Sequence, residues 1–246
     1  MSDVKKLSEK IKGLPTVNDM TDRTIITNGS DGSLGKMSAE LMLDGVFIMY
    51  HRNNDNSALL AKPYKWAELQ SKGEVADGVA IVEGGRVVLV VAPTEAGGDG
   101  LTWSGTEGES GGVTAADRIA AMADFEGQSN TEAIVSKSTS VVASYAPGFC
   151  RLYSRVNTKG AGITAGKWWL PSVGELIVIY SNLAKINYCL NIISDGMPLT
   201  ENWYWSSTDR NARTAWGLRF EDGLIADWNI KVSSKCRVRP VSTFIQ

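Results

Sequence analysis

The C-terminal stretch WYWSSTDRNARTAWGLRFEDGLIADWNI, residues 203–230, decides the fold. From Trp203 onward its pattern has a period of two, which is typical of strands with one buried face. Asp222-Gly223 is a two-residue hairpin signal. We therefore expect a hairpin that pairs Glu221 with Leu224, Phe220 with Ile225, Arg219 with Ala226 and Leu218 with Asp227.

Alternation along the two strands assigns each side chain to one of two faces. The predicted inner face carries Trp216, Leu218, Phe220 and Ile225. The predicted outer face carries Gly217, Arg219, Glu221, Leu224, Ala226 and Trp228. Leu224 and Trp228 are unusual on a merely solvated face and suit a recognition surface with an arginine nearby. Alternatively, Trp228 covers a neighbouring loop of the same chain.

The predicted ligand-binding surface extends beyond this outer face. The polar segment before the hairpin would line the same rim with Arg210, Asn211, Arg213 and Thr214, and Asn229 follows Trp228. Trp169, Trp205 and Trp216 are expected to be scaffold. Arg237 and Arg239 alternate along a strand, so both lie on one side, where we expect them to bond carbonyl groups of loops.

Upstream of this stretch, Ser172 and Glu175 form a capping box before a helix with the buried stripe Leu176, Ile179, Leu183 and Ile186. Further helices are expected from Thr114 to Phe125, around Asn130 to Lys137, and within Val141 to Tyr153. Their apolar faces would carry Ile119, Met122 and Phe125 in the first of these, and Phe149, Leu152 and Tyr153 in the last. The glycine-rich run from Gly97 to Gly112 predicts a long surface loop around Trp103, and no G-K-[ST] follows that would make it a phosphate-binding loop.

The central sheet is predicted from a hairpin of Gly78 to Glu83, the turn Gly84-Gly85, and Arg86 to Ala92. Both arms are nearly continuous Val, Ile and Leu, so both faces are expected to be buried. Val46 to Tyr50 is a further strand. Residues 16–72 are otherwise interpreted as a connector or attachment segment, and residues 73–246 as the ligand-binding domain.

Residues 1–15 form a predicted helix with Val4, Leu7, Ile11 and Leu14 at the spacing of an a/d seam. Two heptads are too short to hold a free helix together. The helix therefore docks on its own domain or packs against copies of itself, and we expect a homo-oligomer, most simply a trimer.

Composition excludes several classes of protein. A hydrophobic fraction of 43% supports a sizeable core, and a net charge of −2 lacks the footprint of a nucleic-acid binder. No apolar run approaches a membrane span, so membrane insertion is not expected. The single histidine, His51, leaves little room for a Ser-His-Asp site. Cys150, Cys189 and Cys236 share no C-x-x-C spacing and are expected to be buried apolar residues.

The ordered C-terminal motifs resemble a known family. They are Trp168-Trp-Leu-Pro-Ser172, Tyr204-Trp-Ser-Ser-Thr208, Ala215-Trp216, Phe220, Gly223, Lys231 and Arg237-Val-Arg-Pro-Val241. This set is similar to C-type-lectin-fold domains of the formylglycine-generating-enzyme subtype, and within them to variable proteins of diversity-generating retroelements. The resemblance covers roughly residues 73–246, and Gly13 to Met20 resembles the attachment ends of phage tail fibres.

The resemblance implies an α+β C-type lectin fold: a small twisted antiparallel sheet, two flanking helices and long loops. It also implies a diversified ligand-binding surface within about residues 203–241. The expected protein is a phage tail-fibre tip adhesin that recognises a bacterial cell-surface protein or glycan, with residues 1–45 contacting other tail proteins. The N-terminus has no apolar stretch typical of a secretory signal, which favours a virion part over a bacterial surface adhesin.

Two other functions known for the same fold require residues that this sequence does not have in the right pattern. A formylglycine-generating enzyme needs a close pair of reactive cysteines, whereas the three cysteines here stand in framework segments. A calcium-dependent lectin needs a Glu-Pro-Asn or Gln-Pro-Asp loop and a Trp-Asn-Asp motif. Asp227-Trp228-Asn229 has those residue types in another order, and the acidic residues Asp195, Asp209, Glu221 and Asp222 are expected at turns and on the surface. We expect no catalysis, cofactor or metal.

Overall fold

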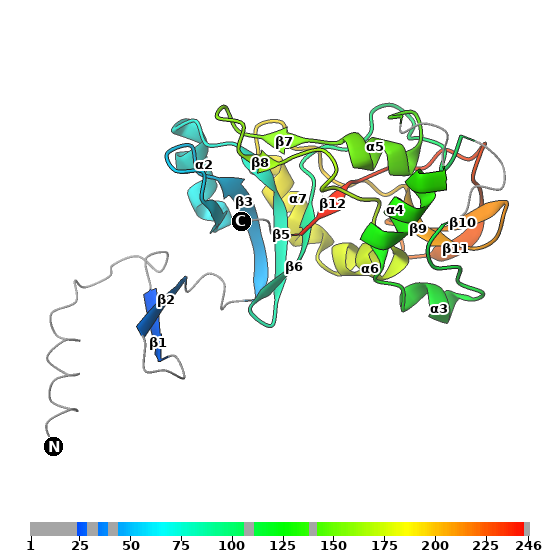
Figure 1. The fold of residues 1–246 in the computed structure, drawn as a ribbon, viewed down its shortest axis with the longest axis horizontal. Coiled ribbons are helices and arrows are strands. Elements are labelled where there is room, and N and C mark those ends of the chain that lie inside the picture. The colour runs from blue at the N-terminus through cyan, green and yellow to red at the C-terminus, as the bar shows by residue number, and fades with distance from the viewer. Residues whose placement is uncertain (1–23, 29–33, 39–43, 106–110, 138–141, 244–246) are drawn as a thin grey trace, which may run out of the picture.

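The computed structural model describes residues 24–28, 34–38, 44–105, 111–137 and 142–243 (Figure 1). It is an α+β structure, as predicted, and each pair of strands in its described sheets is antiparallel. The fold has a five-stranded and a three-stranded sheet with helices packed between and around them (Figure 1).

The larger sheet has the strand order β12-β6-β5-β3-β4. Its strands are β3 (Gly45–His51), β4 (Ala58–Ala61), β5 (Ala76–Glu83), β6 (Arg86–Val91) and β12 (Val241–Ser242). Glu83 pairs with Arg86 across Gly84-Gly85, where both glycines have positive φ, so the predicted hairpin is confirmed. β5 is buried almost throughout, but the first half of β6 is not, and Val88 is exposed.

The smaller sheet has the order β11-β10-β9 and lies at the opposite end of the domain from β3 (Figure 1). It consists of β9 (Trp203–Asp209), β10 (Thr214–Arg219) and β11 (Ile225–Ile230). A two-residue ladder joins β7 (Arg155–Val156) to β8 (Gly162–Ile163). These bounds place the predicted period-two segment on three strands.

The helices are α2 (Pro63–Ser71), α3 (Arg118–Met122), α4 (Gly127–Lys137), α5 (Ala146–Leu152), α6 (Val173–Ser181) and α7 (Leu183–Ile192). The predicted capping box is confirmed at the start of α6, where Ser172 and Glu175 bond each other's backbone N–H groups. The single helix expected after it is two helices, because the chain leaves helical geometry at Asn182. None of the helices in the described segments is long and apolar enough to span a membrane.

One hydrophobic core joins both sheets through α6 and α7. Leu176 and Ile179 of α6 and Ile186 of α7 are fully buried, alongside Ile81 of β5 and Leu218 of β10. Three of the four predicted stripe residues are thus buried, and Leu183 packs against the core from its margin. The three-stranded sheet is therefore held to the rest of the domain by its inner face.

The predicted boundary at residue 73 is wrong as a boundary of the sheet. β3 lies between β4 and β5, with Phe47 opposite Ala80 and Ile48 opposite Val79. Trp66 of α2 is fully buried against this sheet. The segment 45–71 is part of the folded domain because its apolar residues supply strand partners and core that β5 requires.

Trp103 corrects the prediction of a surface loop. Its side chain is fully buried in a second core cluster with Trp205 and Val238, and its Nε1 donates to the Ser206 carbonyl at 2.7 Å. The loop that carries it is anchored because Leu101 exchanges backbone hydrogen bonds with Cys236. The Trp103 side chain is therefore not available to a ligand.

The apolar face expected between Thr114 and Phe125 points outward. α3 begins after an Asp117 cap, and Ala121 is the helix residue that is buried. Ile119, Met122 and Phe125 are exposed, as is Leu152 at the end of α5, which was expected to turn inward. Spacing alone could not show which face of so short a helix packs against the domain.

Within the predicted connector, β1 (Thr24–Asn28) pairs with β2 (Leu34–Ser38). The predicted helix over residues 1–15 lies outside the described residues. Its role in oligomerisation stays a prediction.

Candidate functional site

The hairpin register differs from the prediction by two residues. Ile225 pairs with Leu218 rather than Phe220, and the turn is longer, with the Gly223 N–H donating to the Arg219 carbonyl at 2.9 Å. Gly223 has a φ of 75°, a left-handed backbone conformation that glycine adopts without strain because it has no Cβ. A shift of two preserves the face of each side chain because strands alternate with that period.

The predicted inner face is confirmed. Trp216, Leu218, Phe220 and Ile225 are all buried in the main core. Phe220 stacks on Tyr204 with ring centroids 4.4 Å apart and also contacts Tyr180 of α6. This face therefore holds the hairpin to the scaffold and is not available to a ligand.

A β-bulge on β11 directs Trp228 outward. Ala215 pairs with Asn229 and Gly217 with Ala226, so Asp227 and Trp228 together lie opposite one residue of β10. Bulges of this kind redirect side chains and are common near binding sites. The Trp228 side chain is 60% exposed.

Three side chains, one from each strand, form an array that we call the outer patch: Trp203, Arg219 and Trp228. The rings of Trp203 and Trp228 meet edge-on with centroids 5.6 Å apart and an interplanar angle of 70°. The Arg219 guanidinium lies 5.6 Å from the centroid of the Trp203 ring. An aromatic pair beside an arginine is a composition enriched at binding hot spots.

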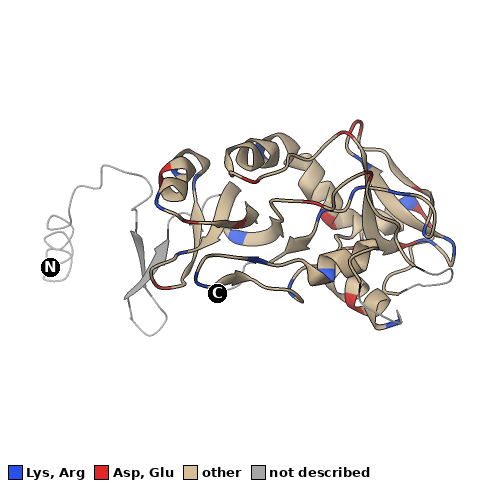
Figure 2. Cartoon of the chain, turned by 90° about the horizontal axis from the view of Figure 1, so that it is seen from above, with Lys and Arg blue, Asp and Glu red and all other residues tan. Residues whose placement is uncertain are grey.

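Ion pairs surround the outer patch. Arg210 Nε donates to Asp227 Oδ2 at 2.8 Å, next to Trp228, and Arg219 Nε donates to Asp222 Oδ1 at 3.0 Å. The Arg219 contact lowers the pKa of Asp222 to about 2, so this pair stays charged. Figure 2 shows basic and acidic positions interspersed along the ribbon.

Three residues predicted on the binding surface are buried: Gly217, Ala226 and Asn229. Gly217 lies between Trp205 on β9 and Ala226 on β11, and a Cβ on Gly217 would be 3.7 Å from the Trp203 ring. The outer face is thus covered beside Gly217, because Trp203 of β9 and Asn229 of β11 lie against this position. Strict alternation could not predict this cover from a third strand.

The remaining predicted residues lie at the two ends of the strands. Asn211 caps the β9–β10 turn by accepting from the N–H groups of Arg213 and Thr214 at 2.8 and 2.9 Å. Asn211 and Arg213 are exposed, while Arg210 and Thr214 are half-buried. At the other end, Glu221 is exposed and Leu224 half-buried. Arg210 pairs with Asp227, the residue before Trp228, and Arg219 lies over the Trp203 ring at the other end of the sheet.

Glu221 also borders a depression of about 650 Å³ on the inner side of the turn. This hollow runs beside Tyr180, Asn187 and Thr200. Glu221 therefore stands between the outer patch and the surface of α6 and α7.

Trp203 and Asp227 are functional candidates that the sequence analysis missed. The signal for Trp203 was available, because it shares a face with Trp205 in a period-two strand. What could not be seen was that Trp205 is covered by the second core cluster while Trp203 is only partly buried. Asp227 became a candidate only through its pairing with Arg210.

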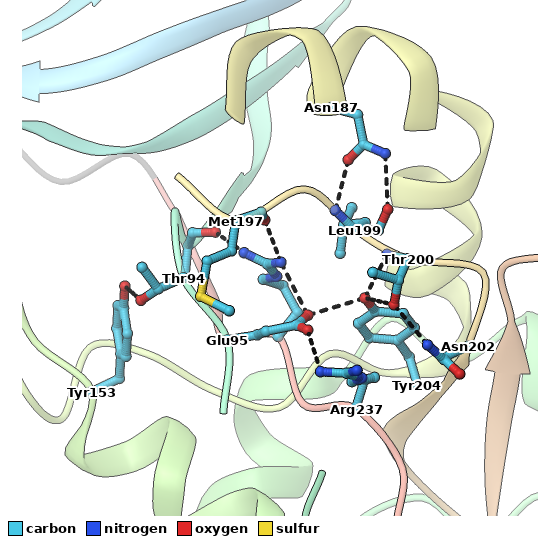
Figure 3. Close-up of polar contacts among 12 residues, drawn as sticks. Thr94, Glu95, Tyr153, Asn187, Met197, Leu199, Thr200, Asn202, Tyr204 and Arg237 are labelled. Carbon is cyan, nitrogen blue, oxygen red and sulfur yellow. Dashed lines mark hydrogen bonds and ion pairs between the residues drawn. The ribbon is translucent and has the colours of Figure 1, made fainter. Parts of the chain in front are cut away.

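A network of polar side chains links Arg237 and Arg239 to Glu95 and to Tyr204 of β9 (Figure 3). Glu95 accepts hydrogen bonds from Arg237 Nη1 at 3.2 Å, and from Arg239 Nη2 and the Tyr204 hydroxyl at 3.0 Å each. Arg239 also donates to the carbonyls of Ala92 and Met197. The expected carbonyl contacts are confirmed for Arg239, and the shared carboxylate of Glu95 is the partner that the sequence did not reveal.

A buried ion pair lies at the end of the β10–β11 hairpin that is opposite its turn. Lys231 Nζ lies 2.6 Å from Asp209 Oδ1, and 4.4 Å from the centroid of the Trp103 ring. Both charged side chains are almost completely buried, so the expectation that Asp209 lies at a turn or on the surface is wrong. This pair joins the ends of β9 and β11 to the loop that carries Trp103.

The side chains that could act as acids, bases or nucleophiles, namely His51, Asp77 and the three cysteines, lie away from the outer patch. His51 Nδ1 and Asp77 Oδ2 are 2.6 Å apart inside the five-stranded sheet, and burial raises the pKa of Asp77 to about 6. All three cysteines are buried and free, as expected, and burial raises the pKa of Cys189 and Cys236 to about 12. Across the described segments, no group of three or more His, Cys, Asp or Glu side chains comes together to hold a metal ion.

Comparison with known proteins gives one structural likeness. No family model and no curated protein matches the chain. The crystal structure of a fimbrial protein from Bacteroides ovatus ATCC 8483 aligns with a TM-score of 0.46 and 18% identity, over 90% of this chain and 49% of that one. The chain thus spans about half of the length of the fimbrial protein.

Proposed function

We propose that this chain is a non-enzymatic receptor-binding protein whose outer patch contacts the ligand. The observation that carries the proposal is Trp228, a large aromatic side chain that is 60% exposed on a sheet whose other face is buried. The residues that contribute most to binding at interfaces are enriched in tryptophan, tyrosine and arginine. Trp228, Trp203 and Arg219 supply these residue types in one place.

The proposal includes a C-type lectin fold of the type found in variable proteins of diversity-generating retroelements. The separation of buried and exposed side chains in the three-stranded sheet supports this fold. Trp205 and Trp216 are buried, while Trp228 is exposed on the outer face. The arginines of the Arg237-Val-Arg239 strand support it as well, since both are held inside the domain by Glu95. A surface of this kind tolerates substitution because its side chains contribute little to the core.

In this proposal the chain forms the tip of a phage tail fibre and recognises a bacterial cell-surface protein or glycan. It assembles as a trimer and contacts other tail proteins through residues 1–45. A bacterial surface adhesin is the alternative that uses the same binding surface. Sequencing of the DNA downstream distinguishes them from an unrelated binder, because a near-copy of the variable region beside a reverse-transcriptase gene marks the retroelement.

The test replaces Arg219, Glu221, Leu224 and Trp228 together by other residues. We expect binding to bacterial cells to change, while the free energy of unfolding moves by no more than about 0.5 kcal/mol for each site. Ala226 is left unchanged because it is buried. The matched control is Ile119→Ala, which removes an apolar side chain that is 81% exposed on α3. Unchanged cell binding in the quadruple variant would contradict the proposal.

A further inference from the structure

An unpartnered amide lies at the base of the outer patch. Asn229 is 9% exposed, and its Nδ2 atom is buried without a hydrogen-bond partner. Buried polar atoms without partners are rare in native proteins and call for an explanation. One explanation is that a bound ligand supplies the missing hydrogen-bond acceptor.

The amide faces the outer side of the sheet. A Cβ built on Gly217 would lie 3.5 Å from Asn229 Nδ2 and 3.7 Å from the Trp203 ring. Because residue 217 has no side chain, nothing from it separates the amide from the tryptophan. The donor therefore lies on the Trp203 side of the sheet rather than on the face that packs against the main core.

The free ring surface suits the apolar face of a sugar. Trp228 meets Trp203 edge-on and keeps 60% of its side chain exposed. The face of an indole ring is electron-rich and attracts groups that carry partial positive charge. The C–H groups on one side of a pyranose ring carry such partial positive charge and form a flat apolar surface that can stack on an indole ring.

The charges around the patch favour a neutral ligand. Arg210, Arg213 and Arg219 are balanced by Glu221, Asp222 and Asp227, and two of the arginines are already in ion pairs. Arg210 and Asp227 are each about one-third exposed and form an ion pair next to Trp228 in the sequence, so a donor and an acceptor are both partly accessible there. Hydroxyl groups both donate and accept, so a saccharide can satisfy both kinds of partner at once.

We propose that the Trp203–Trp228 pair and Asn229 form a subsite for one residue of a neutral glycan. The pyranose ring packs on the tryptophans, one of its oxygens accepts from Asn229 Nδ2, and its other hydroxyls reach Arg210 and Asp227. This inference rests on the proposed function, since it names the ligand class of the same surface.

The experiment uses the full chain with ¹⁵N-labelled tryptophan indoles. Methyl glycosides of glucose, galactose, mannose, rhamnose and N-acetylglucosamine are added at millimolar concentration. At least one is expected to shift the indole N–H resonances of Trp203 and Trp228, which are assigned from Trp203→Phe and Trp228→Phe. If none of the five sugars shifts either resonance, the inference is wrong.

Variants separate a binding role from a structural one. Trp228→Ala should weaken binding at least tenfold, and Asn229→Ala about tenfold. The melting temperature of Asn229→Ala should not fall, because the variant removes a buried amide that has no partner in the free protein. Tyr188→Ala is the control, since Tyr188 is an equally accessible aromatic side chain on α7, 57% exposed. Equal losses in Tyr188→Ala and Trp228→Ala would overturn the subsite.

Whole-cell binding distinguishes failure of this inference from failure of the proposed function. Periodate treatment of the cells should abolish binding, and proteinase treatment should not. If proteinase abolishes binding, periodate does not, and Trp228→Ala still prevents it, the ligand is a protein and only the glycan inference fails. If Trp228→Ala leaves cell binding intact, the proposed function itself fails.

Discussion

Glu175 should make the stability of the domain depend on pH. Its carboxylate accepts from the Ser172 N–H at 2.8 Å and lies 3.2 Å from Trp169 Nε1, where it is almost completely buried. Burial, with a smaller contribution from the charge of Asp124, raises the pKa of Glu175 from 4.5 to about 7. The group that caps α6 is therefore protonated in the folded protein over a range in which the unfolded chain is ionised.

The sign follows from proton uptake. Between pH 4.5 and about 7 the folded state binds more protons at Glu175 than the unfolded state, so the free energy of unfolding falls as pH rises. The shift corresponds to a loss of about 2–3 kcal/mol between pH 5 and pH 8. Asp77, whose pKa burial raises to about 6, acts in the same direction.

Glu175→Gln should remove most of this loss. The glutamine carbonyl can still accept from the Ser172 N–H, and the side chain carries no charge at any pH. We expect the variant to be about as stable as the wild type at pH 5 and roughly 1–3 kcal/mol more stable at pH 8. Urea unfolding at pH 5, 6, 7 and 8, followed by circular dichroism, measures the difference.

Glu175→Ala is the control for the cap itself. It removes the charge and the hydrogen bonds together, so it should be destabilised at pH 5, where the wild-type side chain is neutral. If wild type and Glu175→Gln lose stability equally between pH 5 and pH 8, the reasoning from burial is refuted.

Three further predictions concern scaffold and assembly. Trp216→Ala should lower the free energy of unfolding by about 3–5 kcal/mol, because it removes buried apolar surface and leaves a cavity. Thermal melting measured beside the surface variants tests this, and a normal melt would contradict the assignment of Trp216 to the inner face. Lys231→Met should cost about 3–5 kcal/mol by leaving Asp209 buried without its cation, and Lys231→Met combined with Asp209→Leu should recover much of this in urea unfolding. The intact chain should sediment as a trimer that deletion of residues 1–15 weakens, and a monomer at micromolar concentration would end that prediction.

The faces of the C-terminal hairpin could be predicted from the sequence because they depend on local alternation. Trp216 and Leu218 alternate along β10 and Phe220 continues the pattern into the turn, and that pattern tolerates an error of two residues in register. The capping box at Ser172 and Glu175 and the turn at Gly84-Gly85 are equally local, since each involves residues within four positions of one another. These elements were predicted correctly for that reason.

The exposed part of the outer face could not be predicted, because it depends on packing between distant segments. Trp103 is buried by contacts with Ser206 and Lys231, more than 100 residues away in sequence. Trp203 of β9 and Asn229 of β11 lie against Gly217, so the binding surface is smaller than predicted on that side.

Residue types and their alternation, read from the sequence alone, determined an α+β domain with one apolar and one polar hairpin face. Only the tertiary structure decided that a bulge turns Trp228 outward against Trp203 and leaves the Asn229 amide unpartnered beside them. The physical reason is that alternation assigns a side chain to a face, whereas its exposure depends on which distant residues cover that face.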